Sequence, residues 1–136
     1  METVVLDTDV CSFLFRQDSR AEAYRSHLEG RILALSFMSV AELYQWAYLH
    51  NWGETRLARL EKWLRHFVIL PFDNELCRWW AQVRVERQRR GHPISAQDAW
   101  IAACALRYKC ALITHNAADY AGIPGLTVIS EPTAPN

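Results

Sequence analysis

The stretch Val4-Val5-Leu6-Asp7-Thr8-Asp9 joins a short aliphatic run to a pair of acids. A continuous apolar run of this kind, without polar alternation, indicates a strand buried on both faces, as in a parallel sheet. An acid directly after such a strand points toward the crevice in which open α/β sheets bind their ligands. This one stretch therefore predicts both a parallel sheet and a polar site at the edge of that sheet.

Similar aliphatic runs recur along the 136-residue chain, and helical patterns separate them. The predicted strands are Thr3–Leu6, Ile32–Leu35, Phe67–Leu70, Ala111–Thr114 and Leu126–Ile129. The predicted helices are Asp9–Phe15, Ser19–Leu28, Ser39–His50, Glu54–His66, Asn74–Arg90 and Ala96–Tyr108, with a turn or short helix at Asn116–Tyr120. This alternation predicts an α/β fold, a three-layer α/β/α sandwich around a five-stranded parallel sheet. We expect one domain over residues 1–130 and a loose tail, Glu131–Asn136.

Composition narrows the class of protein. The formal net charge is zero, which counts against extended wrapping of nucleic acid but not against a nuclease whose metal ions supply positive charge. The four cysteines include no C-x-x-C pair, so we expect free thiols in a reducing, cytoplasmic compartment. We expect neither a signal peptide nor a membrane-spanning segment.

Four acids stand where a predicted strand ends or a predicted helix begins: Asp7, Glu42, Asp98 and Asp119. Carboxylates that converge repel one another by about 1–4 kcal/mol per close pair at a surface-like dielectric. A fold that keeps such a cluster usually has a cation to place in it. Hard carboxylate ligands favour Mg²⁺ or Mn²⁺, and these ions support phosphoryl-transfer chemistry.

Each of these acids also has a purely structural interpretation. Asp7 could cap the following helix, although Asp9 is the better candidate for that cap. The segments Ser39–Glu42 and Ser95–Asp98 both match the capping-box pattern, in which the fourth side chain returns to the backbone of the first residue. These two motifs alone do not separate helix caps from a catalytic pair.

The order of the motifs resembles the PIN-domain family, and most closely the small VapC-type toxins of bacterial toxin–antitoxin pairs. The motifs are Asp7-Thr8-Asp9, Ser39-Val40-Ala41-Glu42, Asp98-Ala99-Trp100-Ile101-Ala102-Ala103 and Thr114-His115-Asn116-Ala117-Ala118-Asp119-Tyr120. The resemblance runs from Val4 to Ile129. It implies a parallel sheet between helices and an endoribonuclease that depends on Mg²⁺ or Mn²⁺ and cleaves structured RNA such as tRNA.

The resemblance also implies roles for individual residues. Its catalytic and metal-binding acids correspond to Asp7, Glu42, Asp98 and Asp119, and its supporting polar residues to Thr8, Thr114 and Asn116. The family commonly has Arg where this chain has His115, so a phosphate contact there would depend on pH. Arg89 and Arg90 are further candidates for RNA contact, and the alternative is a solvated helix end that matches the helix dipole.

Partners are expected near the helix Ser39–His50. Trp46 and Leu49 lie off its apolar face, and Trp52 follows shortly after it. These side chains either pack against the next helix or form a partner surface, because aromatic residues are enriched at interface cores. The resemblance implies a cognate antitoxin that docks near this helix, and a toxin homodimer.

Two other functions compete with the nuclease. A haloacid-dehalogenase-like phosphatase would use Asp7 of the D-x-D start as its nucleophile, but neither Lys62 nor Lys109 lies in a predicted strand-end loop. A catalytically silent binding module would use the region of Trp46, and an intact set of four acids disfavours it.

Overall fold

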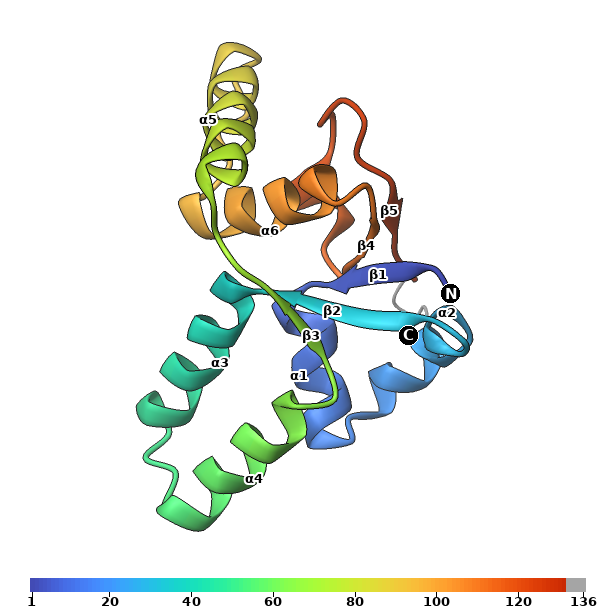
Figure 1. The fold of residues 1–136 in the computed structure, drawn as a ribbon, viewed down its shortest axis with the longest axis vertical. Coiled ribbons are helices and arrows are strands. Elements are labelled where there is room, and N and C mark those ends of the chain that lie inside the picture. Colours follow the sequence, from blue (N-terminus) through green and yellow to red (C-terminus); the bar gives the residue numbers. More distant parts are fainter. Residues whose placement is uncertain (132–136) are drawn as a thin grey trace, which may run out of the picture.

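The computed structural model describes residues 1–131, and its centre is a five-stranded parallel sheet with strand order β3-β2-β1-β4-β5 (Figure 1). The strands are β1 (Thr3–Leu6), β2 (Ile32–Ser36), β3 (Val68–Leu70), β4 (Ala111–Ile113) and β5 (Val128–Ile129). Each strand was predicted from its aliphatic run: β1 has the predicted bounds, and each of the other four differs from its prediction at one end by one or two residues. The α/β fold class and the parallel sheet are therefore confirmed.

Helices cover both faces of the sheet, and this completes the three layers (Figure 1). One face carries α1 (Thr8–Arg16), η1 (Ser19–Tyr24), α2 (Arg25–Leu28), α3 (Phe37–Leu49) and α4 (Glu54–Leu64). The other face carries α5 (Asn74–Arg89) and α6 (Ala96–Arg107), and η2 (Ala117–Tyr120) follows β4. Each face of the sheet has its own hydrophobic core, and alternate residues of β1 belong to the two cores. Val4 and Leu6 pack toward α1 and α3, whereas Val5 packs toward α6.

The strand order places a natural ligand crevice at the carboxyl end of β1. The chain runs outward from β1 through β2 to β3, then crosses back to β4 and β5 on the other side. Ligands of open α/β sheets bind where the strand order reverses in this way. Asp7 follows β1 and Thr114 follows β4, so both enter this crevice between neighbouring strands.

The end of the described chain is anchored to the fold. The Glu131 backbone N–H donates to the Tyr24 hydroxyl at 3.2 Å, and its carboxylate lies 2.6 Å from His27 Nε2. The prediction of a loose tail is therefore wrong at Glu131, and its remainder, residues 132–136, lies outside the described residues. Within residues 1–131 no helix is long and apolar enough to cross a membrane.

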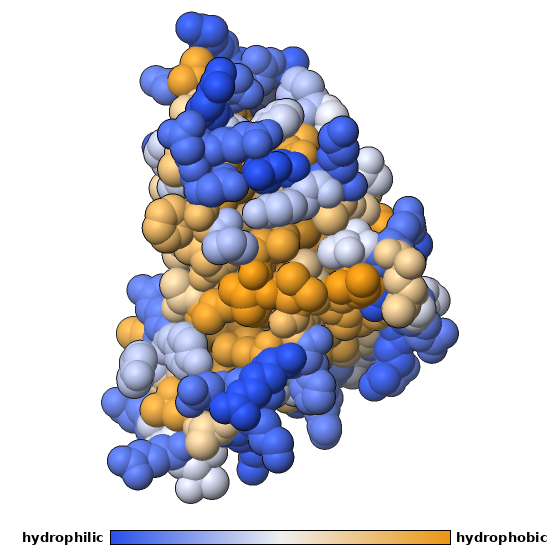
Figure 2. Space-filling model, in the orientation of Figure 1, coloured by the Kyte–Doolittle hydropathy of each residue, from blue (hydrophilic) through white to orange (hydrophobic). Residues whose placement is uncertain are grey.

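The β3 edge of the sheet is apolar and open to solvent. Figure 2 shows hydrophobic side chains gathered across the middle of this side of the molecule. Val68 and Ile69 on β3 are 49% and 39% exposed, and Phe72 just after the strand is 69% exposed. An uncovered edge strand presents free backbone groups to another chain, so this edge is a candidate contact surface.

Candidate active site

Asp7 lies at the centre of the site, between the end of β1 and the start of α1. It is only 7% exposed, and its carboxylate accepts hydrogen bonds from Thr114 Oγ1 at 2.7 Å and from the Thr8 backbone N–H at 2.8 Å. Burial, together with the negative charge of Asp9, raises the pKa of Asp7 to about 7. This carboxyl group therefore changes protonation state near neutral pH.

Asp9 belongs to the same acidic cluster. The interpretation of Asp9 as the helix cap is wrong, because α1 begins at Thr8 and Asp7 occupies the cap position. The Asp9 carboxylate instead accepts from the His115 backbone N–H at 3.1 Å and from Asn116 Nδ2 at 3.0 Å. Burial raises its pKa. The D-x-D spacing is the sequence feature that indicates a second acid at the site, although the same position also fits a helix cap.

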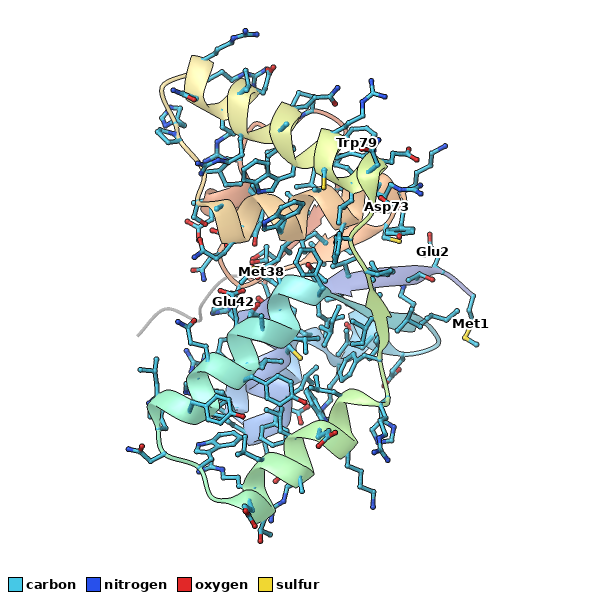
Figure 3. All side chains as sticks on the ribbon, turned by 60° about the vertical axis from the view of Figure 1, so that its left-hand side comes forward. Met1, Glu2, Met38, Glu42, Asp73 and Trp79 are labelled. Atoms are coloured by element: carbon cyan, nitrogen blue, oxygen red, sulfur yellow. The ribbon has the colours of Figure 1, made fainter. Side chains whose placement is uncertain are left out.

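Glu42 reaches the cluster from α3. The capping-box interpretation of Ser39–Glu42 is wrong, because α3 begins at Phe37 and Ser36 Oγ caps it by accepting from the Met38 N–H at 3.0 Å. Glu42 Oε1 accepts from Thr8 Oγ1 at 2.8 Å, and the buried Ser39 Oγ lies 2.9 Å from the same hydroxyl. Burial raises the Glu42 pKa, and the charge of Asp98 adds to this. Figure 3 shows Glu42 near the end of α3 that lies toward α6.

Asp98 combines a structural bond with a place in the cluster. Ser95 caps α6, and its Oγ accepts from the Asp98 backbone N–H at 3.0 Å, which is one of the two bonds of a capping box. The Asp98 carboxylate accepts from the hydroxyl of the buried Tyr120 at 3.2 Å. Burial raises the Asp98 pKa, and so does the charge of Asp119. The helix cap thus uses the backbone N–H of Asp98, and the acidic cluster uses its carboxylate.

This division predicts opposite effects for two neighbouring substitutions. Ser95→Ala should lower the stability of metal-free protein by about 0.5–2 kcal/mol, because a helix cap is lost. Asp98→Asn should leave the melting temperature unchanged or higher, since it removes a charge that burial and Asp119 disfavour. Thermal unfolding in EDTA measures both. A clear drop for Asp98→Asn would show that its carboxylate mainly stabilises the helix start.

Asp119 lies at the exposed rim of the cluster, in η2. Its charge reaches Asp98, while its backbone carbonyl accepts from Arg87 Nη1 at 2.9 Å. Arg87 is only 7% exposed and also donates through Nε to the His92 carbonyl at 2.7 Å. Arg87 therefore fixes the main chain beneath Asp119, and the sequence pattern did not indicate this role.

The three residues predicted to support the acids each contact a different one. Thr114 donates to Asp7, Thr8 donates to Glu42, and Asn116 donates to Asp9. Such bonds orient each carboxylate and leave its other lone pairs for a ligand.

Two of the three predicted RNA-contact residues, His115 and Arg90, have side chains that contact other parts of the protein. The His115 ring packs edge-on against Phe13, and its Nδ1 lies 2.5 Å from the Tyr24 hydroxyl, so only its backbone faces Asp9. Arg90 pairs with Glu86 at 2.9 Å, whereas Arg89 is exposed at the end of α5. Arg89 is thus the more accessible of the two arginines.

The residues predicted for partner contact differ strongly in exposure. Leu49 is 72% exposed, Trp46 is half-buried, and Trp52 is 9% exposed within the core that α1, α3 and α4 share. The Trp46 and Trp52 rings meet edge to face with centroids 5.0 Å apart. Trp52 therefore lies beneath this surface and supports Trp46.

In the described part of the chain the acids of the cluster are not held in ion pairs, although the charge of Arg87 offsets part of the rise that burial causes in the Asp98 pKa. Within residues 1–131 the ion pairs use other acids, and Asp7, Asp9, Glu42 and Asp98 form none. In the same range, no three His, Cys, Asp or Glu side chains form a ready-made metal-binding group. Electrostatic repulsion between these carboxylates keeps them apart when no cation lies between them. Hard oxygen donors with uncompensated charge fit a divalent cation such as Mg²⁺ or Mn²⁺.

Comparison with known proteins gives one family and a consistent set of relatives. The family model described as PIN domain matches residues 4–123. A protein of Salmonella typhimurium named tRNA(fMet)-specific endonuclease VapC is 26% identical over 91% of this chain and 94% of its own. Ribonuclease VapC1 of Haemophilus influenzae strain R2866 is 27% identical over 90% of this chain and 92% of its own.

Solved structures match over nearly the whole length. The VapBC2 complex of Rickettsia felis, bound to a fragment of its promoter DNA, contains a chain with a TM-score of 0.83 at 22% identity, covering 96% of this chain and 99% of that one. This match shows the fold. The VapBC-1 structure of nontypeable Haemophilus influenzae gives a TM-score of 0.79 at 26% identity, covering 94% and 97%.

Proposed function

The chain belongs to the PIN domain family, and on this premise we propose that it is a metal-dependent endoribonuclease, the toxin of a toxin–antitoxin pair. One observation carries the proposal: the carboxylates of Asp7, Asp9, Glu42 and Asp98 are largely or partly buried where the strand order reverses, and none of them forms an ion pair within residues 1–131. Relatives named as ribonucleases support RNA as the substrate. The name of the Salmonella relative supports structured RNA of the tRNA type, and free thiols support a cytoplasmic site of action.

The chain's own residues have separate tasks in this proposal. Asp7, Glu42 and Asp98 would hold Mg²⁺ or Mn²⁺, with Asp119 at the rim, and Asp9 would add a further carboxylate. A cation bound there would lower the pKa of a coordinated water and offset charge at the scissile phosphate. Thr114 and Thr8 hold Asp7 and Glu42 in place by donating to their carboxylates. The Tyr120 hydroxyl does the same for Asp98.

A covalent route through a side chain is disfavoured. Cys11 is the cysteine nearest in sequence to Asp7, and it is fully buried. Burial and the charge of Asp7 raise the pKa of this thiol far above its ordinary value, so the nucleophilic thiolate does not form. Attack by water is the simpler route.

The phosphatase alternative lacks its lysine. Lys62 lies in α4, and Lys109 comes just before β4, at the amino end of that strand. Because the strands are parallel, this places Lys109 at the opposite edge of the sheet from Asp7. Neither lysine is positioned to stabilise a phosphorylated Asp7.

The reaction class can be tested directly with purified protein. We expect discrete fragments from a pool of tRNA and ribosomal RNA in Mg²⁺ or Mn²⁺, and no phosphate release from small phosphomonoesters such as p-nitrophenyl phosphate. The opposite pattern would assign a phosphatase. Silence in both assays, with metal binding retained, would favour the binding module.

A cognate antitoxin is the proposed protein partner. The matched structures named above are toxin–antitoxin complexes, which supports this assignment. The exposed Tyr48 and Leu49, 66% and 72% accessible at the end of α3, offer an apolar contact on the helix that carries Glu42. Coexpression with a neighbouring small gene product should yield a complex with suppressed cleavage. A stable complex with full activity would contradict inhibition at this place.

A second copy of the chain is the proposed occupant of the β3 edge. Two such edges can meet around a two-fold axis, because an isologous contact uses the same surface twice. Phe72→Glu should convert a dimer to a monomer in sedimentation velocity, since it places charge in the middle of an apolar contact. Val85→Glu is the control, because Val85 is also exposed, at 42%, but lies on α5. Equal sedimentation of both variants and wild type would rule out this surface.

A further inference from the structure

A small cavity opens at the acidic cluster, between α1 and α3, and Ser12, Arg16 and Trp46 in its lining have no part in the proposed function. Its volume is about 290 Å³. Asp9 and Glu42 line it together with Ser12, Arg16 and Trp46. A larger cavity of about 490 Å³ lies along α5, but none of the cluster's acids lines it. The smaller cavity thus joins the acids to a cation and an aromatic ring.

We propose that this cavity is a nucleotide subsite, which holds the nucleotide next to the scissile phosphate with its base against Trp46 and a phosphate at Arg16. The inference rests on the proposed ribonuclease function and adds to it the residues that would select the cleavage position. A single-stranded segment fits best, because its base is free to leave the stack and lie on an aromatic side chain.

Arg16 has hydrogen-bonding capacity to spare. Its Nε donates to Ser12 Oγ at 3.2 Å, and its ion pair with Asp18 is long, at 3.8 Å. Asp18 is already held by Arg20, at 2.8 Å and 3.0 Å through two nitrogens. The Arg16 side chain is 37% exposed. Its terminal nitrogens therefore remain available for a phosphate, which guanidinium groups bind through paired hydrogen bonds.

Two neighbouring rings hold the Trp46 side chain in place at the side of the cavity. Its ring meets Trp52 edge to face at 5.0 Å and His50 at 5.9 Å. The Arg16 guanidinium lies over this ring, 5.4 Å from its centroid. A base that stacks on this face of the indole would take the place of the guanidinium, which would then be free to bind the adjoining phosphate. Loss of a base–aromatic stack corresponds to an affinity change on the order of 10- to 100-fold.

The charges that line the cavity are mixed. Asp9 and Glu42 repel a phosphate unless a cation lies beside them, whereas Arg16 attracts a phosphate and repels a basic side chain from a partner. The zero net charge of the chain provides no general attraction for RNA, so binding must come from local contacts of this kind.

The test compares Trp46→Ala, Trp46→Phe and Arg16→Gln with a matched control. Arg56→Gln is that control, because Arg56 also stacks on a tryptophan, at 3.9 Å over Trp52, without lining the cavity. Two quantities are measured: kcat/KM with the fragment pattern on cleavable RNA, and affinity for a labelled single-stranded oligoribonucleotide by fluorescence anisotropy. Circular dichroism and melting temperatures verify that each variant folds.

We expect Trp46→Ala and Arg16→Gln to lower affinity and kcat/KM by tenfold or more and to shift the fragment pattern. Trp46→Phe should keep most of both, and Arg56→Gln should match wild type. If both cavity variants stay within twofold of wild type in both assays, the subsite is overturned. It is also overturned if Trp46→Ala keeps RNA cleavage and affinity but loses a copurifying antitoxin.

Failure of the proposed function is distinguishable from failure of the subsite. If wild-type protein cleaves no RNA with either metal, the ribonuclease proposal fails. The anisotropy measurement then still decides the subsite: weaker binding by Trp46→Ala and Arg16→Gln, but not by Arg56→Gln, supports it. Equal binding by all of these proteins overturns it.

Discussion

Asp7→Asn is expected to reduce RNA cleavage about a thousandfold or more, which corresponds to about 4 kcal/mol of transition-state stabilisation. Asp7 is the most buried acid of the cluster and lies at the strand end where the sheet order reverses. Asparagine keeps the size of the side chain, and its one oxygen can accept from the Thr8 N–H. Its NH2 group then faces the Thr114 hydroxyl, which can accept a hydrogen bond in turn. It removes the negative charge that a divalent cation requires. Single-turnover cleavage in Mn²⁺ measures the effect.

The same variant should be more stable than wild type when metal is absent. Burial raises the pKa of Asp7 from 3.8 to about 7, so the folded state opposes ionisation of this group. Below about pH 4 this group is protonated in both states, and the folded protein keeps the full stability that the neutral form supports. As pH rises to 7 that contribution is lost, because the unfolded state ionises more easily. Asp7→Asn should therefore melt higher than wild type at pH 8 in EDTA, and this advantage should vanish toward pH 4.

Asp73→Asn is the matched control with the opposite sign. Asp73 caps α5 by accepting from the Leu76 N–H at 2.7 Å, and this bond, aided by Arg107, lowers its pKa. Its charged form therefore supports the fold, and Asp73→Asn should melt lower than wild type at pH 8. If both variants move in the same direction, Asp7 is not a strained carboxylate, and the account of its burial is wrong.

Metal should offset part of the stability loss that the wild-type protein undergoes as pH rises. Asp7, Asp9, Glu42 and Asp98 all have raised pKa values, mainly through burial, so metal-free protein should lose stability between about pH 4 and 7. A cation at one hundred times its Kd adds about 2.7 kcal/mol. For a domain of this size, that is a rise in Tm on the order of 10 °C.

Thermal unfolding across this pH range, with EDTA and with Mn²⁺, measures that prediction. The stabilisation by Mn²⁺ should be large at pH 8 and small at pH 5, where protons compete for the same oxygens. Mg²⁺ should act in the same direction. A metal-free Tm that rises from pH 4 to 7, or an equal effect of Mn²⁺ at both pH values, would contradict a metal site built from these acids.

The sheet could be predicted because its strands are short, continuous aliphatic runs. The convergence of Asp7 with the Thr114 segment also followed from the sequence, since the carboxyl ends of parallel strands meet at one edge. The start of α3 could not be placed. Ser36 is both the last residue of β2 and the cap of α3. Ser39, three residues later, also fits a helix cap, because it forms a capping-box pattern with Glu42. Local spacing cannot separate two serines that both match a cap.

Other contacts of the site depend on segments distant in the chain. Asp9 meets His115 and Asn116, which lie more than 100 residues away, and sequence spacing gives no direction for its side chain. Tyr120 reaches Asp98 only because η2 turns its hydroxyl inward. The His115 ring packs against Phe13, although a phosphate contact at the surface had been predicted for it.

The acidic cluster is expected to cleave RNA only with a divalent cation. The most direct measurement takes metal-free protein, adds the RNA that the pool experiment identifies, and titrates Mg²⁺ or Mn²⁺ while single-turnover cleavage is followed. We predict no cleavage in EDTA, saturable recovery with either ion, and the same fragments at every concentration. Cleavage at an undiminished rate in EDTA would contradict this metal requirement.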